Sequence, residues 1–232
     1  MSKPTVHVHE FTDRLTLADK LAHKVEAQLK KGIAARGHAV IAISGGTTPK
    51  AFFAVLARAK VDWSKVTVTL VDERWVPETS DRSNAALVRN FLLKQNAEAA
   101  TFLPLYNGAK DPDAGSAELT KAIGALPTPF DVVVLGMGPD GHTASFFPGG
   151  NNLAQALDLK GKAPVISMTA AGAEEPRITL TLPRILDTEA LFLHFEGEDK
   201  RKVFDEARAG GDYPIAAVLS QSKTPVDVYW SP

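Results

Sequence analysis

The 232-residue sequence contains no cysteine. This absence excludes disulfides, thiolate zinc sites and cysteine nucleophiles, and it is compatible with a reducing compartment. The sequence also lacks any run of eighteen consecutive apolar residues, and its first residues have no apolar segment typical of a secretory signal. We therefore expect a cytoplasmic protein that does not bind a membrane.

An excess of charge of either sign is also missing. Lys and Arg together number 26 against 27 Asp and Glu, which gives a formal net charge of −1. This balance provides no global attraction for nucleic acid or an anionic membrane, so an anionic ligand would need a local site. The 44% hydrophobic content is sufficient for a sizeable core. Without repeats, low-complexity tracts or a linker, residues 1–232 are expected to form a single domain.

Apolar runs and periodicities predict alternating strands and helices. Strands are expected at residues 6–11, 39–43, 66–71, 132–135, 165–168, 177–182, 190–195 and 226–230. Helices are expected at residues 15–36, 51–59 and 117–126, after Ser83-Asn84 and after Lys200, with a polar loop at residues 107–115. Gly37 should end the first helix, because glycine readily adopts the left-handed conformation found beyond helix ends. Several strands read as short unbroken apolar runs, which is typical of a parallel sheet covered on both faces.

A glycine-rich turn with two polar side chains follows the strand at residues 132–135. It reads Gly136-Met137-Gly138-Pro139-Asp140-Gly141-His142. Ligands of open α/β sheets bind outside the carboxyl ends of the strands, so Asp140 and His142 are expected in such a crevice. A neutral imidazole there can act as a base. The alternative is an ordinary turn, since Asp-Gly is a common turn sequence.

A second glycine turn, Ser44-Gly45-Gly46-Thr47-Thr48-Pro49, lies between a predicted strand and a predicted helix. Backbone N–H groups at a helix start attract anions, and two glycines allow a phosphate to approach the main chain closely. The spacing matches neither the Walker loop nor the Gly-x-Gly-x-x-Gly motif of dinucleotide folds. It therefore predicts a site for the phosphate of a small molecule. The alternative is that Thr47 or Thr48 simply caps the helix.

Two cationic residues are candidates for binding the same anion. Arg74 follows a predicted strand in Asp72-Glu73-Arg74, and its planar guanidinium suits phosphate oxygens. For Asp72 and Glu73, a structural ion pair with an arginine is an open alternative. Lys200 lies near a predicted helix start, where a lysine opposes the helix dipole unless an anion is bound. A solvated lysine is the alternative there.

Together these segments resemble the 6-phosphogluconolactonase family over nearly the whole chain. The matching segments are Ser44-Gly45-Gly46-Thr47-Thr48-Pro49, residues 71–77 with Ser83-Asn84, residues 135–145, residues 177–181, and Gly197 with Lys200. Departures are mild: Thr47 stands where serine is frequent, and Phe146 where leucine is frequent. Each segment is a weak signal alone, but their order forms a specific signature.

The resemblance implies a three-layer Rossmann-like α/β fold, with a mostly parallel central sheet and helices on both faces. This fold is shared with glucosamine-6-phosphate deaminase and ribose-5-phosphate isomerase. The implied activity is that of a cytoplasmic hydrolase of the oxidative pentose phosphate pathway, which converts 6-phospho-D-glucono-1,5-lactone to 6-phosphogluconate. No metal or organic cofactor is implied. The expected partner is the phosphosugar lactone, and we expect a monomer or small homo-oligomer.

A mechanism follows from these expectations. His142 would take a proton from the water that attacks the lactone carbonyl, and Asp140 would orient the imidazole or hold a sugar hydroxyl. The two side chains need not touch. Backbone N–H groups of the glycine-rich turn or a cationic side chain such as Arg74 would meet the oxyanion. The residues expected to bind phosphate and sugar are Ser44, Gly45, Gly46, Thr47, Arg74 and Lys200.

Two other functions compete with this one. A sugar-phosphate isomerase or deaminase on the same fold needs a carboxylate base over C2 of its substrate. Members of the deaminase family carry an Asn-Glu pair shortly after their Gly-His, where residues 144–147 here read Ala-Ser-Phe-Phe. A non-catalytic sugar-phosphate sensor would be expected to carry a DNA-binding segment, whereas this chain begins almost at once with the first predicted strand.

Overall fold

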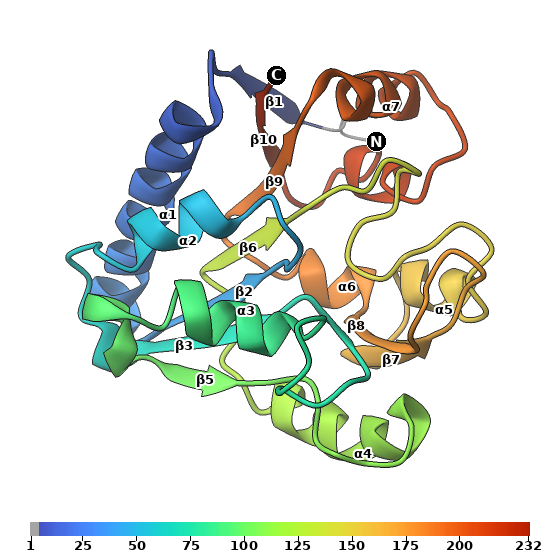
Figure 1. The fold of residues 1–232 in the computed structure, drawn as a ribbon, viewed down its shortest axis with the longest axis horizontal. Coiled ribbons are helices and arrows are strands. Elements are labelled where there is room, and N and C mark those ends of the chain that lie inside the picture. The colour runs from blue at the N-terminus through green and yellow to red at the C-terminus, as the bar shows by residue number, and fades with distance from the viewer. Residues whose placement is uncertain (1–4) are drawn as a thin grey trace.

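Seven parallel strands form the central sheet of the protein, whose computed structural model describes residues 5–232 (Figure 1). In sheet order they are β1 (Val6–Glu10), β10 (Val226–Ser231), β9 (Leu191–Glu196), β6 (Val132–Leu135), β2 (Ala39–Ile43), β3 (Val66–Leu70) and β5 (Thr101–Leu103). Each neighbouring pair is parallel. Every residue of β2 and β6 is buried, which agrees with the prediction of strands covered on both faces.

Helices flank this sheet, as predicted for an α/β fold (Figure 1). Helix α1 (Arg14–Arg36) packs against β2 and β10 and alongside α2 (Lys50–Leu56). Asp13 caps its first turn by accepting two backbone N–H groups, and Gly37, at φ 79°, closes its last turn. The other helices are α3 (Asn84–Phe91), α4 (Pro112–Gly124), α5 (Leu153–Leu157), α6 (Leu182–Ile185), α7 (Glu198–Arg208) and α8 (Ala216–Leu219), with short 3-10 helices at Trp63–Lys65 and Gln95–Ala99. Among residues 5–232, none of these helices combines the length and apolarity needed to span a membrane.

A second, antiparallel sheet adds three short strands beside the central one. Its order is β4 (Asp72–Arg74), β8 (Arg177–Leu180) and β7 (Val165–Met168), and α4 packs against β7. Sequence patterns did not predict this separate sheet. Its β4 begins just after β3 ends, so the charged segment after a buried strand becomes a strand itself and places Arg74 opposite Arg177.

Three predicted elements have boundaries that are wrong by two or more residues. Helix α4 starts at Pro112 rather than 117, so the end of the predicted loop at residues 107–115 is helical. The reason is a local cap: the Asp111 carboxylate accepts the Ala114 N–H at 2.7 Å, and a proline occupies the first turn. Two predicted elements end early, the strand at residues 177–182 at Leu180 and the helix at residues 51–59 at Leu56.

The order of the strands reverses between β2 and β6. From β2 the chain proceeds to β3 and β5 on one side, whereas β6, β9 and β10 extend the sheet on the other. In open α/β sheets such a reversal opens a crevice outside the carboxyl ends of the strands, where ligands bind. The Ser44 N–H donates to the Val134 carbonyl at 2.9 Å, so the loops that follow β2 and β6 start side by side at this edge.

Candidate active site

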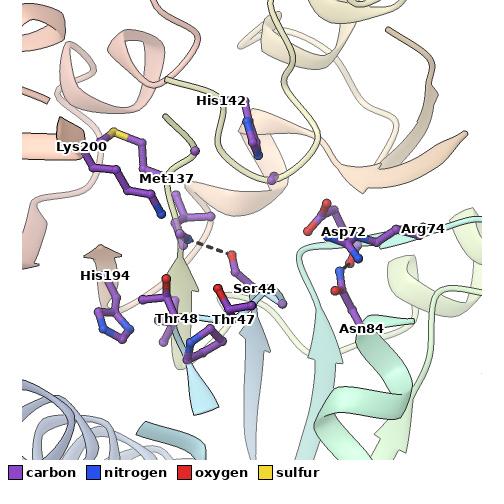
Figure 2. A pocket seen from close by; sticks show the side chains of 18 of the residues that line it. Ser44, Thr47, Thr48, Asp72, Arg74, Asn84, Met137, His142, His194 and Lys200 are labelled. Atoms are coloured by element: carbon purple, nitrogen blue, oxygen red, sulfur yellow. Dashed lines mark hydrogen bonds between the residues drawn. The ribbon is translucent and has the colours of Figure 1, made fainter. Parts of the chain in front are cut away.

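A pocket of about 240 Å³ lies at the carboxyl ends of β2, β6 and β9 and beside β4 (Figure 2). The residues of its lining that the sequence had indicated are Ser44, Gly45, Gly46, Thr47, Arg74, His142 and Lys200. Among the described residues, three cationic side chains line it, those of Arg74, Arg177 and Lys200, against one carboxylate, that of Asp72. This excess of positive charge favours an anionic ligand.

His142 is held by a carboxylate. Its Nδ1 lies 2.5 Å from Asp140 Oδ1, and its backbone N–H donates to the same oxygen at 3.2 Å. The contact that the sequence left open is therefore present, although Asp140 does not line the pocket itself. Burial raises the pKa of Asp140, but the hydrogen bond and charge of His142 outweigh it and hold this pKa below its ordinary value. In the tautomer that donates Nδ1–H to this carboxylate, the lone pair of the ring is on Nε2.

The glycine-rich turn leaves room for the imidazole. A Cβ at Gly138 would lie 2.1 Å from His142 Cε1, so a larger residue would displace the ring. Gly141 has φ 74°, and a Cβ there would meet the Tyr213 ring at 2.6 Å. The Phe147 ring lies 4.6 Å from the imidazole, centroid to centroid. Gly138 and Phe147 thus limit the positions that the His142 ring can adopt.

The loop after β2 is joined to the turn after β6. Ser44 Oγ accepts the Gly136 N–H at 2.9 Å, the hydrogen bond drawn in Figure 2. A Cβ at Gly45 would lie 1.9 Å from Asn84 Oδ1, so only glycine allows Asn84 to pack against the loop. Two segments ninety-two residues apart are therefore rigidly connected across the crevice.

The threonines of this loop do not cap α2, so that alternative is wrong. The residue at the N-cap position is Pro49, and no side chain caps the helix. Gly46, at φ 91°, turns the chain in a conformation that favours glycine. Thr47 and Thr48 line the pocket instead (Figure 2), where their hydroxyls are available to a ligand.

Two arginines form one wall of the pocket. Arg74 and Arg177 are partners in the β4–β8 pair, and Arg74 Nη1 donates to the Arg82 carbonyl at 2.6 Å. Arg177 is buried; burial lowers its pKa, and the nearby Asp72 carboxylate opposes that effect. Asp72 accepts a hydrogen bond from the Ser145 hydroxyl at 2.6 Å. The wall is therefore cationic, and hydrogen bonds to the Arg82 carbonyl and the Ser145 hydroxyl hold Arg74 and Asp72 in place.

Glu73 supports this wall and forms no ion pair with any of residues 5–232, so an ion pair is the wrong explanation for it. It is fully buried and accepts three backbone N–H groups, each at 2.8 Å, from Arg74, Asn84 and Ala85. Burial raises the pKa of Glu73, and these hydrogen bonds oppose the rise. The carboxylate joins β4 to the start of α3 and thereby fixes the backbone that carries Arg74.

Lys200 enters the pocket from the first turn of α7. Figure 2 shows it on the side opposite Arg74, with His142 above the space between them. Burial lowers the pKa of Lys200, and the Glu196 carboxylate partly offsets this effect. Lys200 makes no hydrogen bond or ion pair with another side chain in the described part of the chain. Its ammonium group is therefore free to bind an anion.

Comparison with known proteins identifies the family. The family described as glucosamine-6-phosphate isomerases/6-phosphogluconolactonase matches residues 12–230. The chain belongs to this family. A protein of Rhizobium meliloti (strain 1021) named 6-phosphogluconolactonase is 50% identical, over 98% of this chain and 100% of the relative. One from Mesorhizobium japonicum with the same name is 53% identical, over 96% and 94%. The crystal structure of a 6-phosphogluconolactonase from Shewanella baltica OS155 has a TM-score of 0.94 and 41% identity, over 98% of both chains.

Sequence patterns did not identify several pocket residues of this family member. Arg177 reaches the pocket because β8 pairs with β4, a contact that no local pattern reveals. Asn84 was interpreted as part of a helix cap, but Ser83 alone provides the cap, and Asn84 faces the pocket. His194 lies in an otherwise apolar strand and also lines the pocket. A polar side chain within a buried apolar run was the signal that could have identified it as a site residue.

The arrangement provides an imidazole in contact with a carboxylate, with cationic groups on two sides of the space in front of it. In a family of sugar-phosphate enzymes, such a pocket suits proton transfer on a phosphorylated sugar. Among residues 5–232, no cluster of three or more His, Cys, Asp or Glu side chains is placed to hold a metal ion.

Proposed function

We propose that the protein hydrolyses 6-phospho-D-glucono-1,5-lactone to 6-phosphogluconate, with His142 as the general base. The observation that carries this proposal is the Asp140–His142 pair at the mouth of a pocket lined by Arg74, Arg177 and Lys200. Relatives at 50% and 53% identity bear the name 6-phosphogluconolactonase, which supports the choice of substrate.

The reaction needs one base that later acts as an acid. His142 Nε2 takes a proton from water as the water oxygen attacks the lactone carbonyl carbon. The tetrahedral intermediate then collapses, the bond between that carbon and the ring oxygen breaks, and the imidazolium returns its proton to the leaving ring oxygen. Asp140 stays ionised throughout, keeps Nδ1 protonated and stabilises the transient imidazolium.

The two cationic sides of the pocket bind different parts of the substrate. Lys200 and the loop of Gly45, Gly46 and Thr47 hold the phosphate, and Ser44 fixes that loop to the turn that carries His142. Arg74, with Arg177 beside it, faces the lactone and stabilises its oxyanion. This division places the carbonyl below the imidazole, and fixed orientation of this kind accelerates an already facile hydrolysis.

The proposal includes the setting implied by the substrate: the oxidative pentose phosphate pathway in the cytoplasm, with no metal or organic cofactor, and a monomer or small homo-oligomer. The test is hydrolysis of freshly generated lactone, coupled to 6-phosphogluconate dehydrogenase, with and without a chelator. We expect chelator-resistant acceleration over the spontaneous rate. Binding of 6-phosphogluconate without acceleration would favour a sensor instead.

A second function of the family rests on Asp72. It is the carboxylate among the described residues of the pocket lining, and an isomerase or deaminase needs a carboxylate base over C2. Its Oδ2 is occupied by the Ser145 hydroxyl, and its charge faces Arg177, so we expect it to position groups rather than move protons. Incubation with glucosamine-6-phosphate tests this point: we expect no release of ammonia.

A further inference from the structure

Asn84 carries a hydrogen-bond acceptor that the mechanism above does not use. The residue begins α3, has 3% of its surface exposed and lines the pocket. Its Nδ2 donates to the Asp72 carbonyl at 3.0 Å, whereas its Oδ1 accepts no hydrogen bond from residues 5–232. Polar atoms of buried residues normally have a partner, so this oxygen calls for a donor from outside the chain.

The amide cannot exchange the positions of its oxygen and its nitrogen. The Asp72 carbonyl can only accept a hydrogen bond, so the NH2 group must face it and Oδ1 must point elsewhere. The amide also lies against Gly45, where a Cβ would be 1.9 Å from Oδ1. The backbone N–H of Asn84 donates to Glu73 Oε1 at 2.8 Å. Main chain and side chain are therefore both fixed, and Oδ1 stays an acceptor.

An acceptor at this position distinguishes the two ends of the proposed substrate. A phosphate dianion offers acceptor oxygens alone, so it gains nothing from Oδ1, whereas a sugar hydroxyl offers a donor. Figure 2 shows Asn84 with Asp72 and Arg74 on one side of the pocket and Lys200 on the other. The side that carries Asn84 therefore suits the hydroxyl-bearing end of the substrate.

We propose that Asn84 is a specificity-determining residue, whose Oδ1 accepts a hydrogen bond from the C2 hydroxyl of the lactone. The inference rests on the proposed function, in which Arg74 stabilises the oxyanion on C1. Arg74 and both groups that hold Asn84 belong to β4, so the amide and the guanidinium keep a fixed relation. The C2 hydroxyl is the one next to the carbonyl carbon, so a lactone whose carbonyl faces Arg74 brings it to the side of Asn84.

The test compares 6-phosphogluconolactone with its 2-deoxy analogue, each freshly generated by oxidation of the corresponding hexose 6-phosphate. Hydrolysis is followed by the proton that each turnover releases. Each kcat/KM is divided by the spontaneous hydrolysis rate constant of the same lactone, because loss of the hydroxyl changes the reactivity of the carbonyl. We expect the wild type to favour the hydroxylated lactone by about tenfold or more, since the analogue leaves the acceptor unpaired. Equal corrected values overturn the proposal.

Asn84→Ala separates recognition of the hydroxyl from support of the fold. We expect a loss of about tenfold or more in corrected kcat/KM for 6-phosphogluconolactone and almost none for the analogue, so that the preference disappears. The matched control is Asn96→Ala, which loses an amide bond to the Arg58 carbonyl away from the pocket and should keep the wild-type preference. Equal losses for both lactones would make Asn84 a structural residue alone and refute the inference.

A measurement on the wild type decides the matter if Asn84→Ala does not fold. The side-chain amide 1H–15N signals of Asn84 are recorded with saturating 6-phosphogluconate and with its 2-deoxy analogue. We expect 6-phosphogluconate to shift them clearly more than the analogue does, because only the first can donate a C2 hydroxyl to Oδ1. The Asn96 signals are the internal control and should not change. Equal shifts of the Asn84 signals contradict the proposal.

The same experiments distinguish failure of this inference from failure of the proposed function. If the wild type hydrolyses both lactones without preference, the inference is wrong and the lactonase proposal stands. If it hydrolyses neither lactone, but the Asn84 signals respond to 6-phosphogluconate and not to the 2-deoxy acid, the proposed function is wrong and the hydroxyl contact stands. If it neither hydrolyses the lactones nor binds the acids, both proposals are wrong.

Discussion

Replacement of Asp140 by Asn tests how much the carboxylate behind His142 contributes to turnover. In the wild type, Asp140 Oδ1 lies 2.5 Å from His142 Nδ1. The substitution keeps the size of the side chain and an oxygen that can lie near Nδ1, but it removes the negative charge. Hydrogen bonds to charged groups contribute about 1.5–3 kcal/mol, against about 0.5–1.5 kcal/mol for neutral ones. The difference of about 1–2 kcal/mol corresponds to a roughly 5- to 30-fold lower kcat, since about 1.4 kcal/mol is tenfold in rate.

A larger loss is expected if the amide turns its NH2 group toward the ring. That orientation would favour a proton on Nε2, which is the wrong tautomer for a base. A comparable aspartate-to-asparagine change in the serine-protease triad lowers kcat about 10⁴-fold for this reason. The predicted fall in kcat for Asp140→Asn is therefore at least about fivefold, and it does not exceed the fall caused by removing the base itself.

The assay is steady-state hydrolysis of the lactone with the coupled dehydrogenase, together with the Kd of 6-phosphogluconate. The matched control is Asp158→Asn, which removes another surface carboxylate whose contact is the Lys160 N–H. Because Asp140 acts through His142, the double variant Asp140→Asn/His142→Asn should be no slower than His142→Asn alone. Wild-type kcat in Asp140→Asn, or fully additive losses in the double variant, would refute the reasoning.

Four further predictions concern the groups that line or support the pocket. Glu73→Gln should lower Tm, because the amide NH2 would face the backbone N–H groups that the carboxylate accepts, and a buried unsatisfied donor costs about 1–3 kcal/mol. Each kcal/mol shifts Tm by about 2–4 °C in a protein of this size. An unchanged Tm in calorimetry would contradict the role of Glu73. Lys200→Ala should raise KM far more than it lowers kcat. Burial lowers the pKa of Lys200, so its positive charge is lost at a lower pH than that of an ordinary lysine. In the wild type, the Kd of 6-phosphogluconate should therefore rise at a pH below the ordinary lysine pKa. A Kd that stays constant up to about pH 10 would contradict the role of Lys200 in binding. Gly45→Ala should weaken 6-phosphogluconate binding about tenfold or more, since its Cβ would lie 1.9 Å from Asn84 Oδ1, whereas Gly172→Ala, with open space around it, should bind normally.

Local sequence signals identified the elements that carry the site because those elements depend on local chemistry. The unbroken apolar runs of β2 and β6 require burial on both faces, and this pattern is visible without knowledge of their neighbours. Parallel strands bring their carboxyl ends to one edge, so the presence of Ser44 and His142 in the same pocket agrees with the fold class. The cap formed by Asp111 was also local, but Gly108 before it and Pro112 after it were interpreted as part of a surface loop.

Contacts between distant strands were not predictable in the same way. Arg177 lies in the pocket because β8 pairs antiparallel with β4, and the partner of a short strand is chosen by tertiary packing. Glu73 read as an ion-pair candidate, but its partners are backbone N–H groups whose positions depend on how α3 meets β4. His194 was overlooked because a single histidine in a buried strand gives no periodic signal.

The most direct test of the account is the turnover of freshly generated 6-phosphogluconolactone by His142→Asn. General base catalysis by a positioned side chain contributes about 10²–10⁴-fold, so kcat should fall by at least about 100-fold. The Kd of 6-phosphogluconate should change little, because the phosphate and sugar contacts remain. A variant that binds the product and retains wild-type kcat would contradict the assignment of His142 as the base.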